Sequence, residues 1–160
     1  MMAAQMKTEA RTFSMDPQSG LRTGYGNWAF VPSILFGGGF GKGYAYGETG
    51  FAVRTHDYSE EIRSTLEVGY SPLKNFWTAL VIDTRRSLKN GSYDDGNGLH
   101  TALYVNDQEY DAWGLKFSYQ LENQLGISAA FYGAFGGSRV AAFPTLNMGV
   151  FYQWKGKQDN

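Results

Sequence analysis

Apolar and polar residues alternate along much of this chain, and the alternation is clearest near its C-terminus. Between residues 145 and 155 the apolar positions are Leu146, Met148, Val150, Tyr152 and Trp154. The positions between them are small or polar, with Phe151 as the exception. A period of two is that of a β-strand with one apolar and one polar face. Similar runs predict strands at roughly 24–36, 44–55, 61–70, 75–85, 99–106, 110–121, 125–135 and 145–155.

Short segments rich in Gly, Asn, Asp and Ser separate these runs and predict tight turns. Consecutive strands joined by short turns favour an antiparallel up-and-down meander, and a meander of about eight strands closes into a barrel. We therefore predict one barrel domain over residues 21–155. Residues 1–20 are expected to form a tail or a frayed strand, and residues 156–160 a second tail.

Which face of the strands is buried decides the class of barrel, because a soluble barrel has an apolar interior and a membrane barrel a polar one. The less apolar face of strands 110–121, 125–135 and 145–155 carries mainly Gly, Ala, Ser, Asn and Gln, which suits a lumen. Several runs reach about ten residues, the length of a tilted membrane-spanning strand. Large aromatic residues near strand ends resemble the interfacial girdles of such barrels. We expect a transmembrane barrel, with a soluble lipocalin-like barrel that binds a small hydrophobic ligand as the alternative.

Composition narrows the possible partners. Charged residues make up 18% of the chain and the formal net charge is −1, so the basic excess typical of nucleic-acid binding is absent. The chain has no cysteine, which excludes disulfides, Cys-based zinc sites and thiol catalysis. The chain contains no run of about 18 apolar residues, so no transmembrane helix is predicted. We expect neither a cofactor nor a metal.

The stretch "NMGVFYQW" resembles the C-terminal recognition signal of Gram-negative outer-membrane β-barrels. Its matching positions are Asn147, Gly149, Tyr152 and Trp154, although the chain continues beyond the last aromatic residue through "KGKQDN". The stretch from "TGYGNWAFVPSILFGGGFGKGYAYGETGFAVR" to the end also looks like the C-terminal part of outer-membrane transporters of phenol-degradation (MetA) pathways. The resemblance implies location in the outer membrane, with the lipid bilayer and the outer-membrane assembly machinery as partners. It implies porin-like or transporter-like passage of small molecules, or a structural barrel.

Two sets of candidate functional residues follow from the predicted faces. The candidates for the lumen are Glu48, Arg54, Arg63, Glu67, His100, Tyr104 and Lys116. The candidates for the lipid-facing surface and its girdles are Trp28, Tyr70, Trp77, Trp113, Tyr152 and Trp154. Opposite charges on neighbouring strands predict an ion-pair ladder. Side chains nearly fill an eight-stranded barrel, so there the ladder would be structural; in a larger barrel or a homo-oligomer it would line an aqueous path.

A third class of function is a barrel enzyme that acts on lipid with a Ser–His pair. His100 and Ser118 are the residues considered for it, but no nucleophile motif surrounds either. His56 is expected to be a solvated loop residue. We predict that the protein is not an enzyme.

The predicted strands leave one conflict. Eight strands counted back from the C-terminus place the long connection 87–98 at the same end of the barrel as the end of the last strand. Outer-membrane barrels usually keep their long loops at the opposite end. A missed strand or a wrong pairing would remove the conflict.

Overall fold

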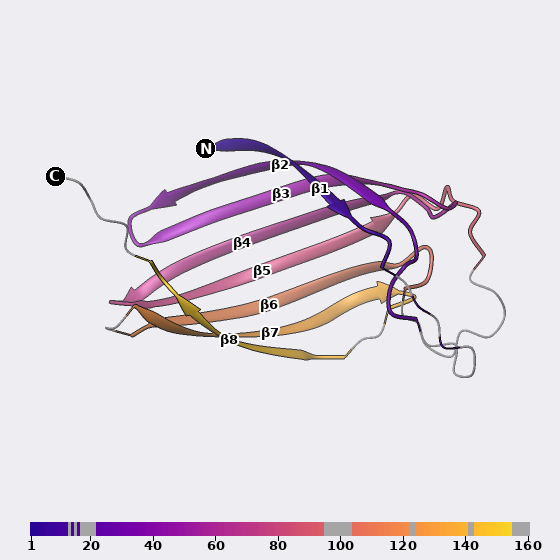
Figure 1. The fold of residues 1–160 in the computed structure, drawn as a ribbon. Coiled ribbons are helices and arrows are strands. Elements are labelled where there is room, and N and C mark those ends of the chain that lie inside the picture. Colours follow the sequence, from indigo (N-terminus) through magenta and orange to yellow (C-terminus); the bar gives the residue numbers. More distant parts are fainter. Residues whose placement is uncertain are drawn as a thin grey trace.

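The computed structural model describes residues 1–12, 14, 16, 22–94, 104–121, 124–140 and 143–154. The strands are β1 (Met2–Glu9), β2 (Ala29–Phe40), β3 (Gly43–Arg54), β4 (Glu61–Leu73), β5 (Phe76–Ser87), β6 (Glu109–Gln120), β7 (Leu125–Ser138) and β8 (Thr145–Tyr152). They form one curved antiparallel sheet in which each strand pairs with its neighbours in sequence (Figure 1). The predicted all-β up-and-down arrangement is thereby confirmed. No helix among the described residues is long and apolar enough to cross a membrane.

One predicted strand is not found, and one observed strand lies where a tail or a frayed strand was expected. The strand predicted at 99–106 is not formed in its described part, since residues 104–106 have no strand structure, and residues 99–103 lie outside the described residues. At the other end of the chain, β1 occupies Met2–Glu9, within the segment expected to be a tail or a frayed strand, and it pairs with β2 over its whole length. The other seven predicted strands are present with ends shifted by a few residues.

The presence of β1 and the absence of the strand predicted at 99–106 together remove the conflict over loop lengths. The connections 41–42, 74–75 and 121–124 all lie at one end of the sheet, which we call the turn end. The strand ends that are joined by the connections 10–28, 55–60, 88–108 and 139–144 all lie at the opposite end, the loop end. The start of β1 and the end of β8 are near the turn end, on the left of Figure 1. The long connections therefore share one end, as is typical of outer-membrane barrels.

Glycines in the sheet accept aromatic rings from the neighbouring strand. Phe151 lies over Gly126, and a Cβ on that glycine would be 2.1 Å from the ring. Tyr44 covers Gly69 in the same way, also at 2.1 Å. A side chain at either glycine would push the ring away from the strand, so these glycines are sites of close packing. The apolar Phe151 at an inward position, the exception to the alternation in this strand, is explained by this contact with β7.

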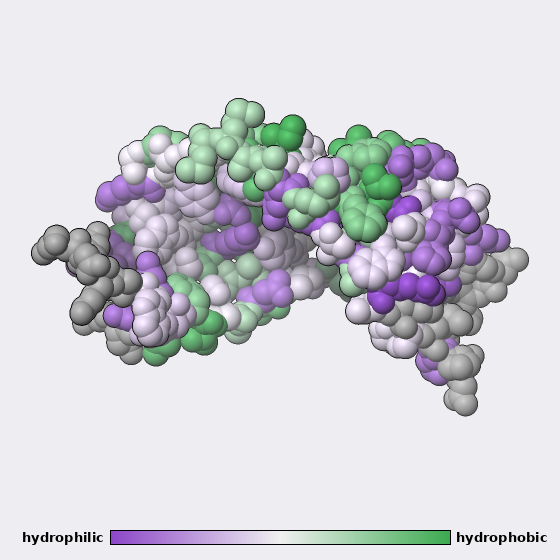
Figure 2. Space-filling view, turned by 45° about the horizontal axis from the view of Figure 1, so that its top comes forward, coloured by the Kyte–Doolittle hydropathy of each residue, from purple (hydrophilic) through white to green (hydrophobic). Residues whose placement is uncertain are grey.

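Burial in this sheet is the inverse of that in a water-soluble barrel. The outer face exposes large apolar side chains, among them Phe30, Ile34, Phe36, Leu66, Val68, Leu80, Phe117, Ile127 and Val150. The inner, concave face carries polar, charged and small residues, and the largest fully buried side chains are those of Glu61 on this face and Ser59 in the β3–β4 connection. Figure 2 looks toward the hollow of the sheet, where hydrophilic residues are visible. Most buried residues lie toward the loop end, where the connections cover the inner face.

The two edge strands, β1 and β8, are not hydrogen-bonded to each other. Every residue of β1 is exposed, and in β8 all residues but Phe151 are. The sheet is therefore open along one seam, with one unpaired strand edge on each side.

Candidate functional site

Charged side chains on the inner face form ion pairs that cross the hollow of the sheet. Lys7 of β1 pairs with Glu48 of β3, and Lys116 of β6 pairs with Glu67 of β4 at 2.6 Å. Each of these two pairs skips one strand, whereas the pair of Arg54 with Glu61 joins the neighbouring strands β3 and β4, as the predicted ladder does. The reason for the skipped strand is curvature, since long side chains that point into a concave surface converge across the strand between them.

Hydroxyl groups extend these ion pairs. Tyr44 donates to Glu67 at 2.5 Å, and Tyr46 donates to Glu48 at 2.7 Å. Tyr110 and Thr65 both donate to Asp83, at 2.9 and 2.8 Å. Carboxylates in a partly enclosed space need several donors to offset their lost hydration. The groups of Glu48 and Asp83 line a cavity of about 220 Å³ in the middle of the inner face.

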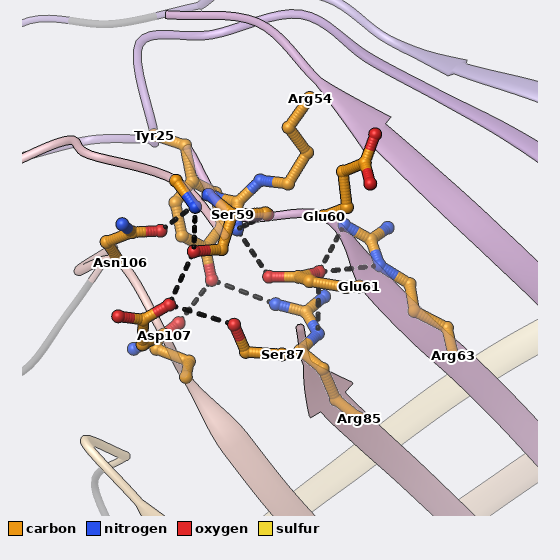
Figure 3. Close-up of polar contacts among 12 residues, drawn as sticks. Tyr25, Arg54, Ser59, Glu60, Glu61, Arg63, Arg85, Ser87, Asn106 and Asp107 are labelled. Atoms are coloured by element: carbon orange, nitrogen blue, oxygen red, sulfur yellow. Dashed lines mark hydrogen bonds and ion pairs between the residues drawn. The ribbon is translucent and has the colours of Figure 1, made fainter. Parts of the chain in front are cut away.

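Toward the loop end, the fully buried Glu61 carboxylate binds three arginines (Figure 3). Arg54 of β3 donates to its Oε1, Arg63 donates to its Oε2 at 3.0 Å, and Arg85 of β5 lies 3.5 Å from Oε2. Glu9 of β1 binds the other side of Arg63. A buried carboxylate is stable only when its charge is compensated, and here one anion is shared among three cations.

Aromatic rings enclose Arg54. Its guanidinium carbon is 4.5 Å from the ring centroids of both Tyr25 and Tyr58, two rings that are perpendicular to each other, so the cation contacts both π-systems. The Tyr25 hydroxyl donates to Gln108 and accepts a hydrogen bond from Arg85 at 2.9 Å. Burial is the largest cause that raises the pKa of the Tyr25 hydroxyl above its ordinary value. Tyr25 therefore stays a neutral donor at the centre of this group.

The connections at the loop end are tied together by a second set of hydrogen bonds. The Ser59 amide donates to Asn106 Oδ1 at 2.9 Å, and the Ser59 hydroxyl donates to Asp107 at 2.6 Å. Ser87 also donates to Asp107, at 2.9 Å, and the Gly91 amide donates to the Ser59 hydroxyl at the same distance. We call this assembly the loop-end cluster: Tyr25, Arg54, Tyr58, Ser59, Glu61, Arg63, Arg85, Ser87, Asn106, Asp107 and Gln108.

The loop-end cluster joins all four connections at that end, because Gln108 also donates to the Arg139 carbonyl at 2.9 Å. It covers the inner face where the connections begin. The predicted strand faces placed Glu61 inward, but nothing in the sequence indicated that it collects three arginines. Arg85 was missed because strand 75–85 is apolar on both faces over most of its length, so its inner face was not assigned. Tyr25, Ser59 and Asp107 were missed because they lie in connections.

The predicted lumen residues divide into three groups. Glu48, Arg54, Arg63, Glu67 and Lys116 all lie on the inner face and take part in the ion pairs described above. Tyr104 lies in the β5–β6 connection, not on a strand, and its ring meets that of Tyr25 edge-on at 5.2 Å. His100 lies outside the described residues.

The predicted lipid-facing residues lie on the outer face with one exception. Tyr70, Trp113 and Tyr152 alternate with inner-face positions on their strands, Trp28 directly precedes β2, and Trp154 is next to Tyr152, at 6.1 Å between ring centroids. Trp77 was placed on the wrong face. It pairs directly with Ser118, an inner-face residue, whereas its neighbour Phe76 stacks on the outer-face Phe117. The alternation rule could not assign Trp77, since both faces of this strand are apolar.

The residues considered for a Ser–His pair are not brought together in the described part of the chain. Ser118 lies on the inner face of β6. His56 lies in the β3–β4 connection, where its ring nitrogens contact Thr55 at 2.8 Å and Arg11 at 3.4 Å. The described residues also contain no group of three or more His, Cys, Asp or Glu side chains placed to hold a metal ion.

The inner face is therefore a surface of compensated charges, hydroxyls and aromatic rings. Comparisons of the chain with protein-family models, with curated proteins and with solved structures find no match.

Proposed function

We propose that this chain is a β-barrel of a Gram-negative-type outer membrane that lets small polar molecules pass. The observation that carries the proposal is the inverted burial: large apolar side chains are exposed over the outer face while charged groups are buried inside. In water this arrangement would leave a wide apolar surface hydrated, whereas in a bilayer lipid covers it. A lipocalin-like protein would need the opposite arrangement, with an apolar interior to hold its ligand.

Strand length and the position of the loops also support this proposal. β2–β6 each have 12 or 13 residues, enough for a tilted strand to cross the hydrocarbon core. Tyr70, Tyr152 and Trp154 gather on the outer face at the turn end, where an interfacial girdle would lie. The resemblance of "NMGVFYQW" to the outer-membrane recognition signal points to the same compartment.

Fluorescence quenching tests the proposed orientation. Four tryptophans are present, so variants that retain only Trp113 or only Trp77 can be made by replacing the others with phenylalanine. In vesicles with brominated acyl chains we expect strong quenching of Trp113 on the outer face and weak quenching of Trp77 on the inner face. Vesicles without bromine are the control. An unquenched Trp113 would contradict the membrane proposal, and equal quenching of both would contradict the assignment of the faces.

A barrel in a membrane must also close its seam, since unpaired backbone groups in hydrocarbon each cost several kcal/mol. In an up-and-down sheet of eight strands, β1 and β8 run antiparallel. Both have eight residues, and full overlap sets Met6 opposite Met148 and Lys7 opposite Asn147. This register joins outer to outer and inner to inner positions. We propose that β1 and β8 pair in this way within one chain.

Disulfide cross-linking tests the closure, because the chain has no cysteine of its own. Met6→Cys with Met148→Cys should form a disulfide within one chain on mild oxidation, seen as a monomer of altered gel mobility. Met6→Cys with Leu66→Cys, on a central strand, is the control and should not cross-link. Disulfide-linked dimers from the first pair would show instead that copies of the chain pair edge to edge.

Passage and a purely structural role make different predictions for ion conductance. The hollow inner face favours passage of small molecules. The ion pairs and the loop-end cluster narrow the space that this face encloses, and they favour a structural barrel. We expect small conductance steps in planar bilayers, increased by Tyr25→Ala because that change opens the loop-end cluster. If neither protein conducts, the barrel is structural.

A further inference from the structure

A pocket at the turn end of the inner face is built by two adjacent rows of paired residues. In the first row Tyr44, Gly69, Ala79, Lys116, Ala130 and Asn147 follow one another across β3 to β8. In the second row Trp77, Ser118, Ser128 and Gly149 do so across β5 to β8. Small residues dominate both rows, so they leave a hollow floor between larger side chains. The resulting pocket has a volume of about 330 Å³, at the lower end of the ~300–1,000 Å³ usual for small-molecule sites.

The walls of the pocket combine aromatic surface with polar groups. Trp77 and Tyr44 supply the rings, and Trp77 is the large aromatic residue whose inward position the alternation of the sequence did not predict. Ser118, Ser128 and Asn147 line the same pocket and contribute two hydroxyls and one carboxamide to it. These groups are arranged to bind a molecule that has both a flat apolar face and several hydrogen-bonding groups.

The charges in the pocket are already compensated. The Lys116 ammonium is 2.6 Å from the Glu67 carboxylate, which also accepts the Tyr44 hydroxyl. An anionic ligand would compete with Glu67 for the lysine, and a cationic ligand would compete with the lysine for Glu67. A purely apolar ligand would strip water from the serine hydroxyls and the Asn147 amide without replacing their hydrogen bonds. The pocket therefore suits a neutral ligand with several hydroxyls.

We propose that this pocket binds a neutral monosaccharide, with one face of the sugar ring against Trp77 and its hydroxyls on Ser118, Ser128 and Asn147. Aromatic rings and a few convergent polar groups are the usual means of orienting such a ligand. The lumenal location of the pocket rests on the proposed function. The binding of the sugar to the folded protein is independent of the proposed function, because it can be measured in detergent micelles as well as in vesicles.

Titration with glucose tests the proposal, using the full chain with Trp77 as its only tryptophan. We expect a saturable change in Trp77 fluorescence with glucose, and little or no change with glucuronate or benzoate at equal concentration. In calorimetry on the otherwise unmodified chain, Asn147→Ala should weaken glucose binding about 2- to 10-fold, the effect of one lost hydrogen bond. Trp77→Leu should abolish it, while Trp113→Leu, the matched change on the outer face, should leave it intact.

The absence of a saturable response to glucose from a folded protein would overturn the proposal, as would equal loss of binding in Trp77→Leu and Trp113→Leu. Saturable binding of benzoate alone would replace the sugar by an aromatic acid. These outcomes are separate from the quenching of Trp113 by brominated lipid, which tests insertion. A protein that inserts but does not bind glucose would retain the proposed function and lose this inference.

Discussion

Replacing Glu61 with alanine is expected to destabilise the protein by about 3–5 kcal/mol, the cost of removing one partner from a buried ion pair. Glu61 is 0% exposed and is bound by Arg54, Arg63 and Arg85. Without it, Arg54 and Arg85 would keep their positive charges close together in a space that excludes most water. The midpoint of urea unfolding, followed by the shift in gel mobility of unheated samples in detergent, measures the change.

Two further variants separate the role of Glu61 from a general loss of ion pairs. Arg54→Met should be less destabilising than Glu61→Ala, because the carboxylate retains Arg63 and Arg85 and the methionine can still pack between Tyr25 and Tyr58. Glu67→Ala should have a small effect, since its partner Lys116 is 42% exposed and can be hydrated. Equal unfolding midpoints for Glu61→Ala and Glu67→Ala would contradict the central place of Glu61 in the loop-end cluster.

The loop-end cluster also accounts for how one end of this sheet is ordered. A polar interior lacks the hydrophobic driving force that packs an ordinary core. Directional contacts must take its place, and the cluster supplies them through one carboxylate with three guanidinium groups, two tyrosine rings on Arg54, and Ser59 with Asp107. Such networks are stable only when nearly every member is satisfied. At the turn end the tight connections themselves hold the strands together, and the inner face stays hollow.

The alternation of apolar and polar residues was enough to predict the sheet and the faces of most strands. It worked for β4, β6, β7 and β8 because each has one apolar face, and register then follows from period two. It failed for β1, where Met2, Ala4, Met6 and Thr8 make the outward face only weakly apolar. It also failed for Trp77, since β5 is apolar on both faces.

The candidate site was predictable only in part. The alternation of side chains along the strands predicted that five charged residues point inward: Glu48, Arg54, Arg63, Glu67 and Lys116. Their ion-pair partners depend on the curvature of the sheet, which the local sequence pattern does not determine. Lys7 meets Glu48 across β2, and Glu9 meets Arg63 across two strands. The loop contacts of Tyr25, Ser59 and Asp107 join residues 20 to 83 positions apart in sequence. The loop lengths carried a usable signal, because the long connection at the wrong end indicated that the predicted set of strands was wrong.

A lysine in place of Leu66 should destabilise the protein in lipid vesicles by about 2–4 kcal/mol, the cost of a cation at the middle of the lipid face of a β-barrel. Leu66 lies near the centre of β4 on the outer face and is 47% exposed. Tyr70→Lys, on the same face but near the turn end, should cost only about 0–1 kcal/mol because its ammonium group reaches the interface. If the outer face were in water, both substitutions would fall within about 0.5 kcal/mol of the unmodified protein. Reversible urea unfolding in vesicles measures the three proteins side by side, and a lysine at position 66 as well tolerated as one at position 70 would contradict a lipid-covered outer face.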